Sequence, residues 1–135
     1  MGENQSALIM DWSKKTILIA EDEDSNYLYL EAVLQKTGAS LLWARSGEEA
    51  IDACKQNPNI DLILMDLQMP NINGYEARHQ IKSIFPNVPQ IAQTAFAMAD
   101  DEKRAMDAGF DAYISKPIRK ANLLTIVGRF LGPLE

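Results

Sequence analysis

The chain has 135 residues, a length typical of one domain and sufficient to bury a core. Its formal net charge is −6 and its Lys and Arg residues form no cluster, which argues against nucleic-acid binding by this chain. No apolar run approaches the roughly 18 residues that span a bilayer, and no signal peptide is recognisable. Cys54 is the only cysteine, so no internal disulfide is expected. We therefore predict a cytoplasmic domain that does not itself contact a membrane, although its parent protein could be membrane-anchored.

Both ends of the chain are expected to lie outside the folded domain. Residues 1–14 show no sustained periodicity and are predicted to form a tail or linker, with Trp12 as a candidate for docking on the domain. The domain itself is expected to cover residues 15–132. Residues 133–135 are predicted to be a C-terminal tail, whose last two residues, Leu-Glu, are typical of a cloning scar.

Short apolar runs alternate with helical patterns from residue 15 onward. Runs of apolar and β-branched residues are typical of buried strands, whereas apolar residues three or four apart indicate helices. The predicted strands are 16–20, 40–44, 60–65, 90–93 and 112–115. The predicted helices are 26–37, 47–56, 75–85, 99–108 and a closing helix that includes 123–130.

Local signals support the helix ends. Gly38 and Gly109 are placed as helix stops, because glycine adopts the left-handed conformation that often follows a helix. Ser46 and Glu49 have the spacing of a capping box at the start of the second helix. The third helix is expected to bury Ala77, Ile81, Ile84 and Phe85.

Five strands alternating with five helices predict an α/β fold. Parallel strands need crossover connections, so the expected architecture is a doubly wound, five-stranded parallel sheet with helices on both faces. In such sheets the functional crevice lies at the carboxyl ends of the strands. Polar residues end or follow four of the predicted strands, namely Glu21, Asp22, Asp66, Thr94 and Lys116.

The three carboxylates at this edge predict a metal site. Two carboxylates at ~4 Å repel each other by on the order of 4 kcal/mol at an effective dielectric constant near 20. Without a counter-ion one of them would take up a proton. Mg²⁺ prefers a few carboxylates together with waters and phosphate oxygens. An incoming phosphoryl group could then be attacked by Asp66 while Mg²⁺ and Lys116 neutralise its oxygens.

Four motifs in this order resemble the receiver domain of response regulators. They are ILIAED at 17–22, LILMDLQMPNINGYE at 62–76, QTA at 93–95 and YISKP at 113–117. The resemblance covers about residues 15–132. It implies a flavodoxin-like sheet with strand order 2-1-3-4-5 and a function as a phosphoacceptor in a two-component phosphorelay.

The resemblance also implies roles for the residues of the site. Asp66 would be the phosphoacceptor. Asp22, Asp66 and the backbone carbonyl of Gln68 would bind Mg²⁺ directly, and Glu21 would act mostly through a metal-bound water. Lys116 would pair with the phosphoryl oxygens. Glu21 stands where the family most often has Asp, so the metal geometry is expected to differ slightly.

The resemblance further implies a conformational switch and residues that set the lifetime of the phosphorylated state. Lys116 and Pro117 would be joined by a cis peptide bond, which proline makes accessible. Thr94 and Tyr113 match the switch pair, in which the hydroxyl moves to the phosphoryl group and the ring turns inward. The surface formed by the fourth helix, fifth strand and closing helix, here called the switch face, would respond. Gln68 and Phe96 occupy positions that tune hydrolysis in this family.

The resemblance implies partners as well. The expected phosphoryl donor is a histidine kinase or a histidine phosphotransfer protein, and a homodimer through the switch face is a further expected assembly. The parent is either a stand-alone receiver or a hybrid histidine kinase; the segment 11–14 and the ILIAED motif favour the hybrid kind. The domain is not expected to be an enzyme with a separate substrate, although it would catalyse its own phosphorylation and dephosphorylation.

Three other protein classes share part of this pattern. An aspartate-nucleophile phosphatase of the haloacid-dehalogenase type needs a second Asp two residues after the nucleophile, where this chain has Gln68, and it usually carries a cap domain. A flavodoxin-like cofactor binder needs a phosphate-binding loop after the first strand, where the acids of 21–24 would repel phosphate. An interaction module that works without phosphorylation would not need the required residue at every position of the site, whereas this chain has one at each position.

Overall fold

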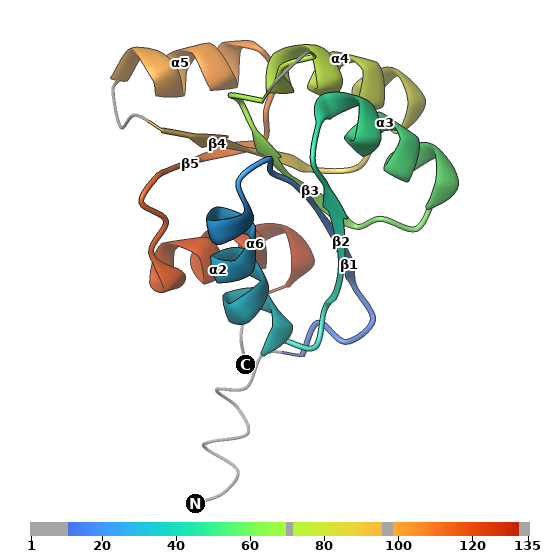
Figure 1. Ribbon diagram of the computed structural model, residues 1–135, viewed down its shortest axis with the longest axis vertical. Helices are drawn as coiled ribbons and strands as arrows, with labels where there is room; N and C mark the ends of the chain where they lie inside the picture. The colour runs from blue at the N-terminus through green and yellow to red at the C-terminus, as the bar shows by residue number, and fades with distance from the viewer. Residues whose placement is uncertain (1–10, 70–71, 96–98, 133–135) are drawn as a thin grey trace, which may run out of the picture.

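The computed structural model describes residues 11–69, 72–95 and 99–132 of the chain. All strand pairs are parallel and the sheet order is β2-β1-β3-β4-β5, which confirms the predicted topology (Figure 1). The strands are β1 Thr16–Ala20, β2 Ser40–Ala44, β3 Leu62–Asp66, β4 Gln90–Thr94 and β5 Ala112–Ser115.

Helices cover both faces of the sheet, so the chain forms three layers (Figure 1). α2 and α6 pack on one face, and α3, α4 and α5 pack on the other. None of the helices within the described ranges is long and apolar enough to cross a membrane. The helices are α2 Asp24–Gln35, α3 Gly47–Gln56, α4 Gly74–Ile84, α5 Ala99–Asp107 and α6 Lys120–Leu131.

The sheet separates two apolar cores because successive side chains of a strand point to opposite faces. In β1, Ile17 and Ile19 join the core under α2 and α6, whereas Leu18 and Ala20 join the core under α3, α4 and α5. All four side chains are fully buried, as is typical of a parallel strand covered on both sides. The sheet is therefore a rigid base for the polar residues at its carboxyl edge.

Several predicted boundaries shift by one or two residues. α2 begins at Asp24 rather than residue 26, with an acidic side chain in its first turn, where the helix dipole favours it. The expectation that Ile84 is buried is wrong, since its side chain is 39% exposed. α4 ends at Ile84, and the backbone leaves the helix at Phe85, whose side chain packs on the core instead.

The capping signal before α3 is correct in part. The Ser46 hydroxyl accepts the backbone N–H of Glu49 at 3.1 Å, as predicted. The Glu49 carboxylate accepts the backbone N–H of Arg45 at 3.0 Å, one residue before the one a capping box uses. Gly38 and Gly109 both have positive φ, at 86° and 101°, as expected of helix stops.

Trp12 docks on the domain, in agreement with the prediction from the sequence. Its side chain is 3% exposed and joins the core under α2 and α6. Its indole Nε1 donates to the carbonyl of Gly132 at 3.3 Å, and its backbone N–H donates to the carbonyl of Thr37 at 2.8 Å. The predicted domain limits at residues 15 and 132 stay predictions, and the tails at 1–10 and 133–135 lie outside the described residues.

Candidate functional site

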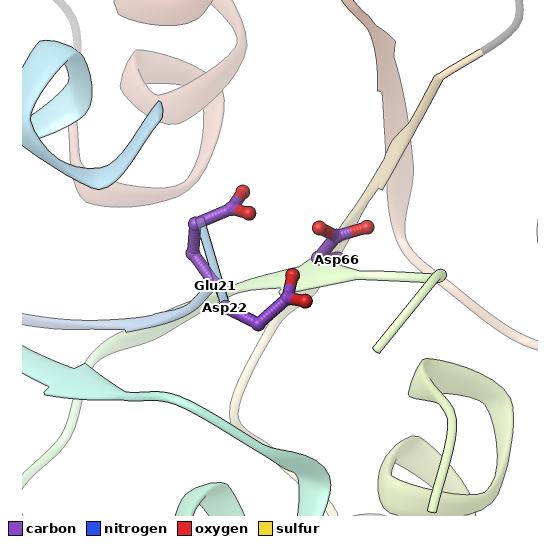
Figure 2. A group of neighbouring side chains, drawn as sticks. All are labelled: Glu21, Asp22 and Asp66. Carbon is purple, nitrogen blue, oxygen red and sulfur yellow. The ribbon is translucent and has the colours of Figure 1, made fainter. Parts of the chain in front are cut away.

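Three carboxylates meet at the carboxyl edge of the sheet, as Figure 2 shows. Ala20 and Met65 are in register on β1 and β3, so the next residues, Glu21 and Asp66, lie side by side. Each of Glu21, Asp22 and Asp66 offers a carboxylate oxygen within 4.8 Å of the others. Glu21 and Asp66 are buried and Asp22 is partly buried. The cluster that the sequence predicted is therefore assembled by strand register.

One ammonium group faces the cluster. Lys116 follows β5, and its Nζ lies 3.1 Å from Oδ2 of Asp66 and 3.5 Å from Oε1 of Glu21. Burial alone would lower the pKa of Lys116, but Asp66 and Glu21 outweigh it and raise that pKa above its ordinary value. A protonated lysine therefore lies beside Asp66. The peptide bond that joins Lys116 to Pro117 is cis.

A single lysine does not balance the buried acids. Burial and the neighbouring Asp66 raise the pKa of the Glu21 carboxyl to about 7. A hydrogen bond from Asn26, the charge of Lys116 and the backbone N–H of Glu23 offset part of this increase. In the absence of another cation, Glu21 therefore takes up a proton near neutral pH.

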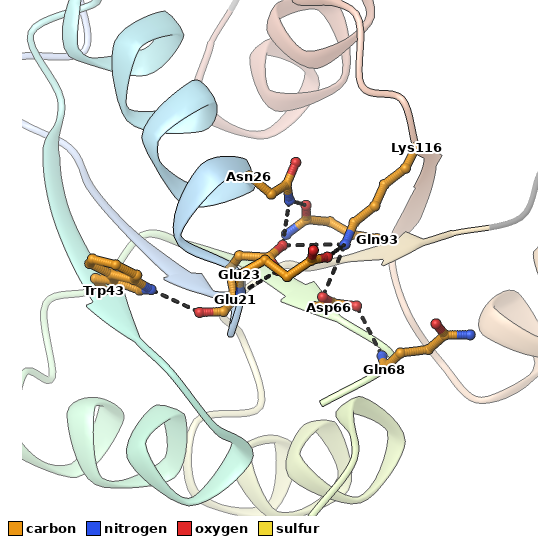
Figure 3. A network of polar contacts seen from close by, with 8 residues as sticks. All are labelled: Glu21, Glu23, Asn26, Trp43, Asp66, Gln68, Gln93 and Lys116. Carbon is orange, nitrogen blue, oxygen red and sulfur yellow. Dashed lines mark hydrogen bonds and ion pairs between the residues drawn. The ribbon is translucent and has the colours of Figure 1, made fainter. Parts of the chain in front are cut away.

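Asp66 has a second polar partner besides the lysine. The backbone N–H of Gln68 donates to Oδ1 of Asp66 at 2.9 Å, while Lys116 contacts the other oxygen (Figure 3). The side chain of Gln68 is exposed and belongs to the loop after β3. Both carboxylate oxygens are thus held, which fixes the plane of the carboxylate.

The two switch candidates lie on neighbouring strands. Thr94 ends β4 and is 3% exposed, and Tyr113 on β5 is partly buried. Burial, followed by the charges of Asp101 and Glu102, raises the pKa of the Tyr113 hydroxyl. Tyr113 and Glu102, which belongs to the acidic first turn of α5, line the same hollow. Phe96, the other predicted tuning position, lies outside the described residues.

Two polar residues of the site were not predicted. Asn26 Nδ2 donates to Oε1 of Glu21 and lies 3.5 Å from Oε1 of Gln93. Gln93 is fully buried, is in register with Asp66, and its Nε2 finds no partner among the described residues. A glutamine directly before Thr94, in a strand that also contains Gln90, was the available signal for Gln93. Asn26 gave no such signal, because polar residues are ordinary in the first turn of a helix.

Trp43 packs on the core and also has a polar contact with the site. The side chain is partly buried at the end of β2 and packs against the core under α2 and α6. Its Nε1 donates to the backbone carbonyl of Glu21 at 2.8 Å (Figure 3). Sequence spacing cannot reveal this contact, since it joins residues on different strands.

The cluster fits a hard divalent cation. Its donors are carboxylate oxygens, which Mg²⁺ prefers, and Asp22 leaves it open to solvent on one side. The three acids face the ammonium group of Lys116, and burial followed by the charge of Asp66 raises the pKa of Glu21. A bound cation would offset the charge of the acids and displace the proton.

Comparison with known proteins agrees with this geometry. The sequence profile of the response regulator receiver domain matches residues 17–128. The polar-differentiation response regulator DivK of Brucella ovis is 37% identical over 120 residues, which are 87% of this chain and 97% of DivK.

Solved structures agree as well. The receiver domain of a Pseudomonas aeruginosa sensor histidine kinase, with magnesium coordinated in its active-site cleft, is 32% identical with a TM-score of 0.80. That match covers 87% of this chain and 98% of the other. The receiver domain of yeast Ssk1, solved with the histidine phosphotransfer protein Ypd1, is 29% identical with a TM-score of 0.80, covering 86% and 88%. By its match to the family profile and its likeness to DivK, the chain belongs to the response regulator receiver domain family.

Proposed function

We propose that Asp66 is the phosphoacceptor of this receiver domain in a two-component relay, and that Mg²⁺ is its cofactor. The observation that carries the proposal is the placement of the Asp66 carboxylate. It is 2% exposed, lies 3.1 Å from the Lys116 ammonium, and has an oxygen within 4.8 Å of oxygens of Glu21 and Asp22. Such an arrangement gives an oriented carboxylate nucleophile next to positive charge.

The proposed donor is a phosphohistidine of a histidine kinase or a phosphotransfer protein, as the complex of Ssk1 with Ypd1 supports. A carboxylate oxygen of Asp66 forms a bond to phosphorus while the bond from phosphorus to the imidazole nitrogen breaks. The imidazole leaves with that electron pair and takes a proton from solvent. Lys116 pairs with a phosphoryl oxygen, because its ammonium already faces Asp66.

Mg²⁺ would be held by the carboxylates of Asp22 and Asp66 and by the carbonyl of Gln68, with Glu21 acting through a metal-bound water. When bound, Mg²⁺ supplies positive charge that offsets the charge of the phosphoryl oxygens. The magnesium ion in the cleft of the related Pseudomonas receiver supports this assignment. The acidic residues of this chain would otherwise repel a phosphoryl donor.

The proposed output is a change at the switch face, formed here by α5, β5 and α6. Thr94 lies at the site and Tyr113 lies on the adjacent strand, so a movement of Thr94 toward the phosphoryl group would change the space beside Tyr113. A hollow of about 320 Å³ lies on this face. It is lined by Glu102, Met106, Asp111, Ala112, Tyr113 and Arg129. A homodimer through this face and a hybrid histidine kinase as parent stay predictions.

Phosphoryl transfer from a radiolabelled phosphohistidine donor tests the proposal. The wild type should acquire acid-stable, base-labile label in the presence of Mg²⁺. Asp66→Asn should acquire none, because the amide keeps the shape but lacks the nucleophilic oxygen. Asp61→Asn is the matched control, since Asp61 lies at the other end of the sheet and accepts the backbone N–H of Thr16. Label that persists in Asp66→Asn would overturn the assignment.

A further inference from the structure

We propose that Trp43 is a positioning residue for the acidic loop, residues 21–23, and that its indole hydrogen bond to Glu21 sets the affinity of the site for Mg²⁺. The inference rests on the proposed function, because it concerns the same carboxylate cluster. It adds a residue from β2, an edge strand, to a site whose other side chains lie on α2 and on or directly after β1, β3, β4 and β5.

The backbone of Glu21 is tied to β2 on both sides. Its N–H donates to the carbonyl of Ala44 at 2.8 Å, which extends the parallel ladder by one residue. Its carbonyl accepts the indole N–H of Trp43 at 2.8 Å. The peptide bond between Glu21 and Asp22 is therefore fixed, and two of the three carboxylates of the cluster extend from either side of that bond.

Trp43 is itself clamped. Its ring stacks on Tyr27 with centroids 3.8 Å apart and planes 2° apart, and the guanidinium of Arg45 lies 3.9 Å from the ring centroid. Two groups this close must lie on opposite faces of the ring. Arg45 also pairs with Asp24 at 2.7 Å. Tyr27 and Asp24 both belong to α2, the helix that follows the acidic loop.

The acidic loop is therefore held against β2 on both sides. At its first residue the two hydrogen bonds of Glu21 hold it, and after its last residue the contacts of Trp43 and Arg45 hold the start of α2. Without a cation, neighbouring carboxylates repel each other and favour backbone conformations that spread them apart. A fixed Glu21 carbonyl removes many of those conformations before the cation arrives. Binding then loses less conformational entropy, which is the general route by which preorganisation raises affinity.

Trp43→Phe tests the role of the indole donor, because phenylalanine keeps an aromatic ring between Tyr27 and Arg45 but has no N–H. Trp12→Phe is the matched control: it also removes an indole hydrogen bond to a backbone carbonyl, that of Gly132, at the far end of the sheet. The measurements are Mg²⁺ titration by calorimetry and thermal unfolding without Mg²⁺. Without this hydrogen bond the loop should occupy its binding-competent conformation about 5-fold less often, so the dissociation constant of Trp43→Phe should be about 5-fold higher.

Trp12→Phe should lower the unfolding temperature and leave the dissociation constant at the wild-type value. Equal dissociation constants in Trp43→Phe and the wild type would overturn the inference while the proposed function stands. An equal increase in both variants would also overturn it, since the effect would then be a general loss of stability. A wild type that binds no Mg²⁺ would overturn the proposed function, and the inference with it.

Arg45→Lys keeps the test decisive if Trp43→Phe does not fold. The side chain of Arg45 is 50% exposed, so its replacement is tolerable, and lysine retains the positive charge near the site. Lysine lacks the planar guanidinium that covers the Trp43 ring. We expect a smaller increase of the Mg²⁺ dissociation constant, about 2-fold, in keeping with a partly loosened ring. An unchanged value in this folded variant would count against the proposal.

Discussion

Carboxylates lie at both ends of the sheet, and the two groups have different partners. At the amino ends, Asp61 and Asp111 each accept one backbone N–H, from Thr16 and Gln90, at 2.8 Å. At the carboxyl ends, the acids lie within 4.8 Å of one another and share one ammonium group. Acidic residues therefore stabilise the starts of strands at one end of the sheet and repel one another at the other end. Their proximity to one another, not their acidity, distinguishes the candidate site.

The largest expected difference between the two ends is the response to Mg²⁺. A ligand that binds only the folded state at 100 times its dissociation constant stabilises it by about 2.7 kcal/mol. Asp22→Ala should remove most of this stabilisation because it deletes a proposed ligand. Asp111→Ala should retain it, since Asp111 caps a strand at the far end. Thermal unfolding with and without Mg²⁺ measures both, and a full response in Asp22→Ala would place the metal elsewhere.

A second prediction concerns pH in metal-free buffer. The folded-state pKa of Glu21, about 7, lies above its ordinary value of 4.5, so the folded state binds more protons between these values. The free energy of unfolding should therefore fall by about 2 kcal/mol as the pH rises from about 5 to about 8. Glu21→Gln should flatten this decrease. Denaturant unfolding at several pH values measures it, and a rise of stability with pH that Glu21→Gln leaves unchanged would contradict the prediction.

At the amino ends of the strands, removal of an acid should lower the stability of the fold and leave Mg²⁺ binding unchanged. Asp61→Ala leaves the half-buried N–H of Thr16 without its acceptor, which should lower the free energy of unfolding by about 1.5 kcal/mol. Mg²⁺ binding should be unchanged because the residue is remote from the cluster. Chemical denaturation and Mg²⁺ titration of the same sample give both quantities. A weakened Mg²⁺ site in Asp61→Ala would show that the two ends are coupled.

The smallest expected effect is a conformational change of the switch face on phosphorylation. Beryllofluoride, which stands in for a phosphoryl group on Asp66, should shift amide NMR signals of residues 99–119 as well as those at the site. The shift should be reduced in Thr94→Ala, which cannot make the hydroxyl contact. Changes confined to the vicinity of Glu21, Asp22 and Asp66 would argue against the proposed output, and phosphoacceptance would remain tenable.

Sequence reasoning recovered the sheet and the clustered acids for the same reason. A buried strand is visible as a short apolar run, and Asp66 is visible because a polar residue ends such a run. The role of Trp43 was not accessible, since an indole at an ordinary core spacing does not indicate which carbonyl its N–H reaches. The burial of Ile84 was predicted wrongly because one residue of helix length decides whether Ile84 or Phe85 packs on the core.

The docking of Trp12 beside Gly132 has a consequence for how the domain can be joined to other domains. The first and last described segments of the chain meet at the end of the sheet opposite the acids (Figure 1). Flanking sequence would enter and leave there, so the domain can be inserted into a host protein as a module without obstructing its site. For the same reason a circular permutant, with residue 132 linked to residue 12 and new ends in an exposed loop, should fold and retain the carboxylate cluster.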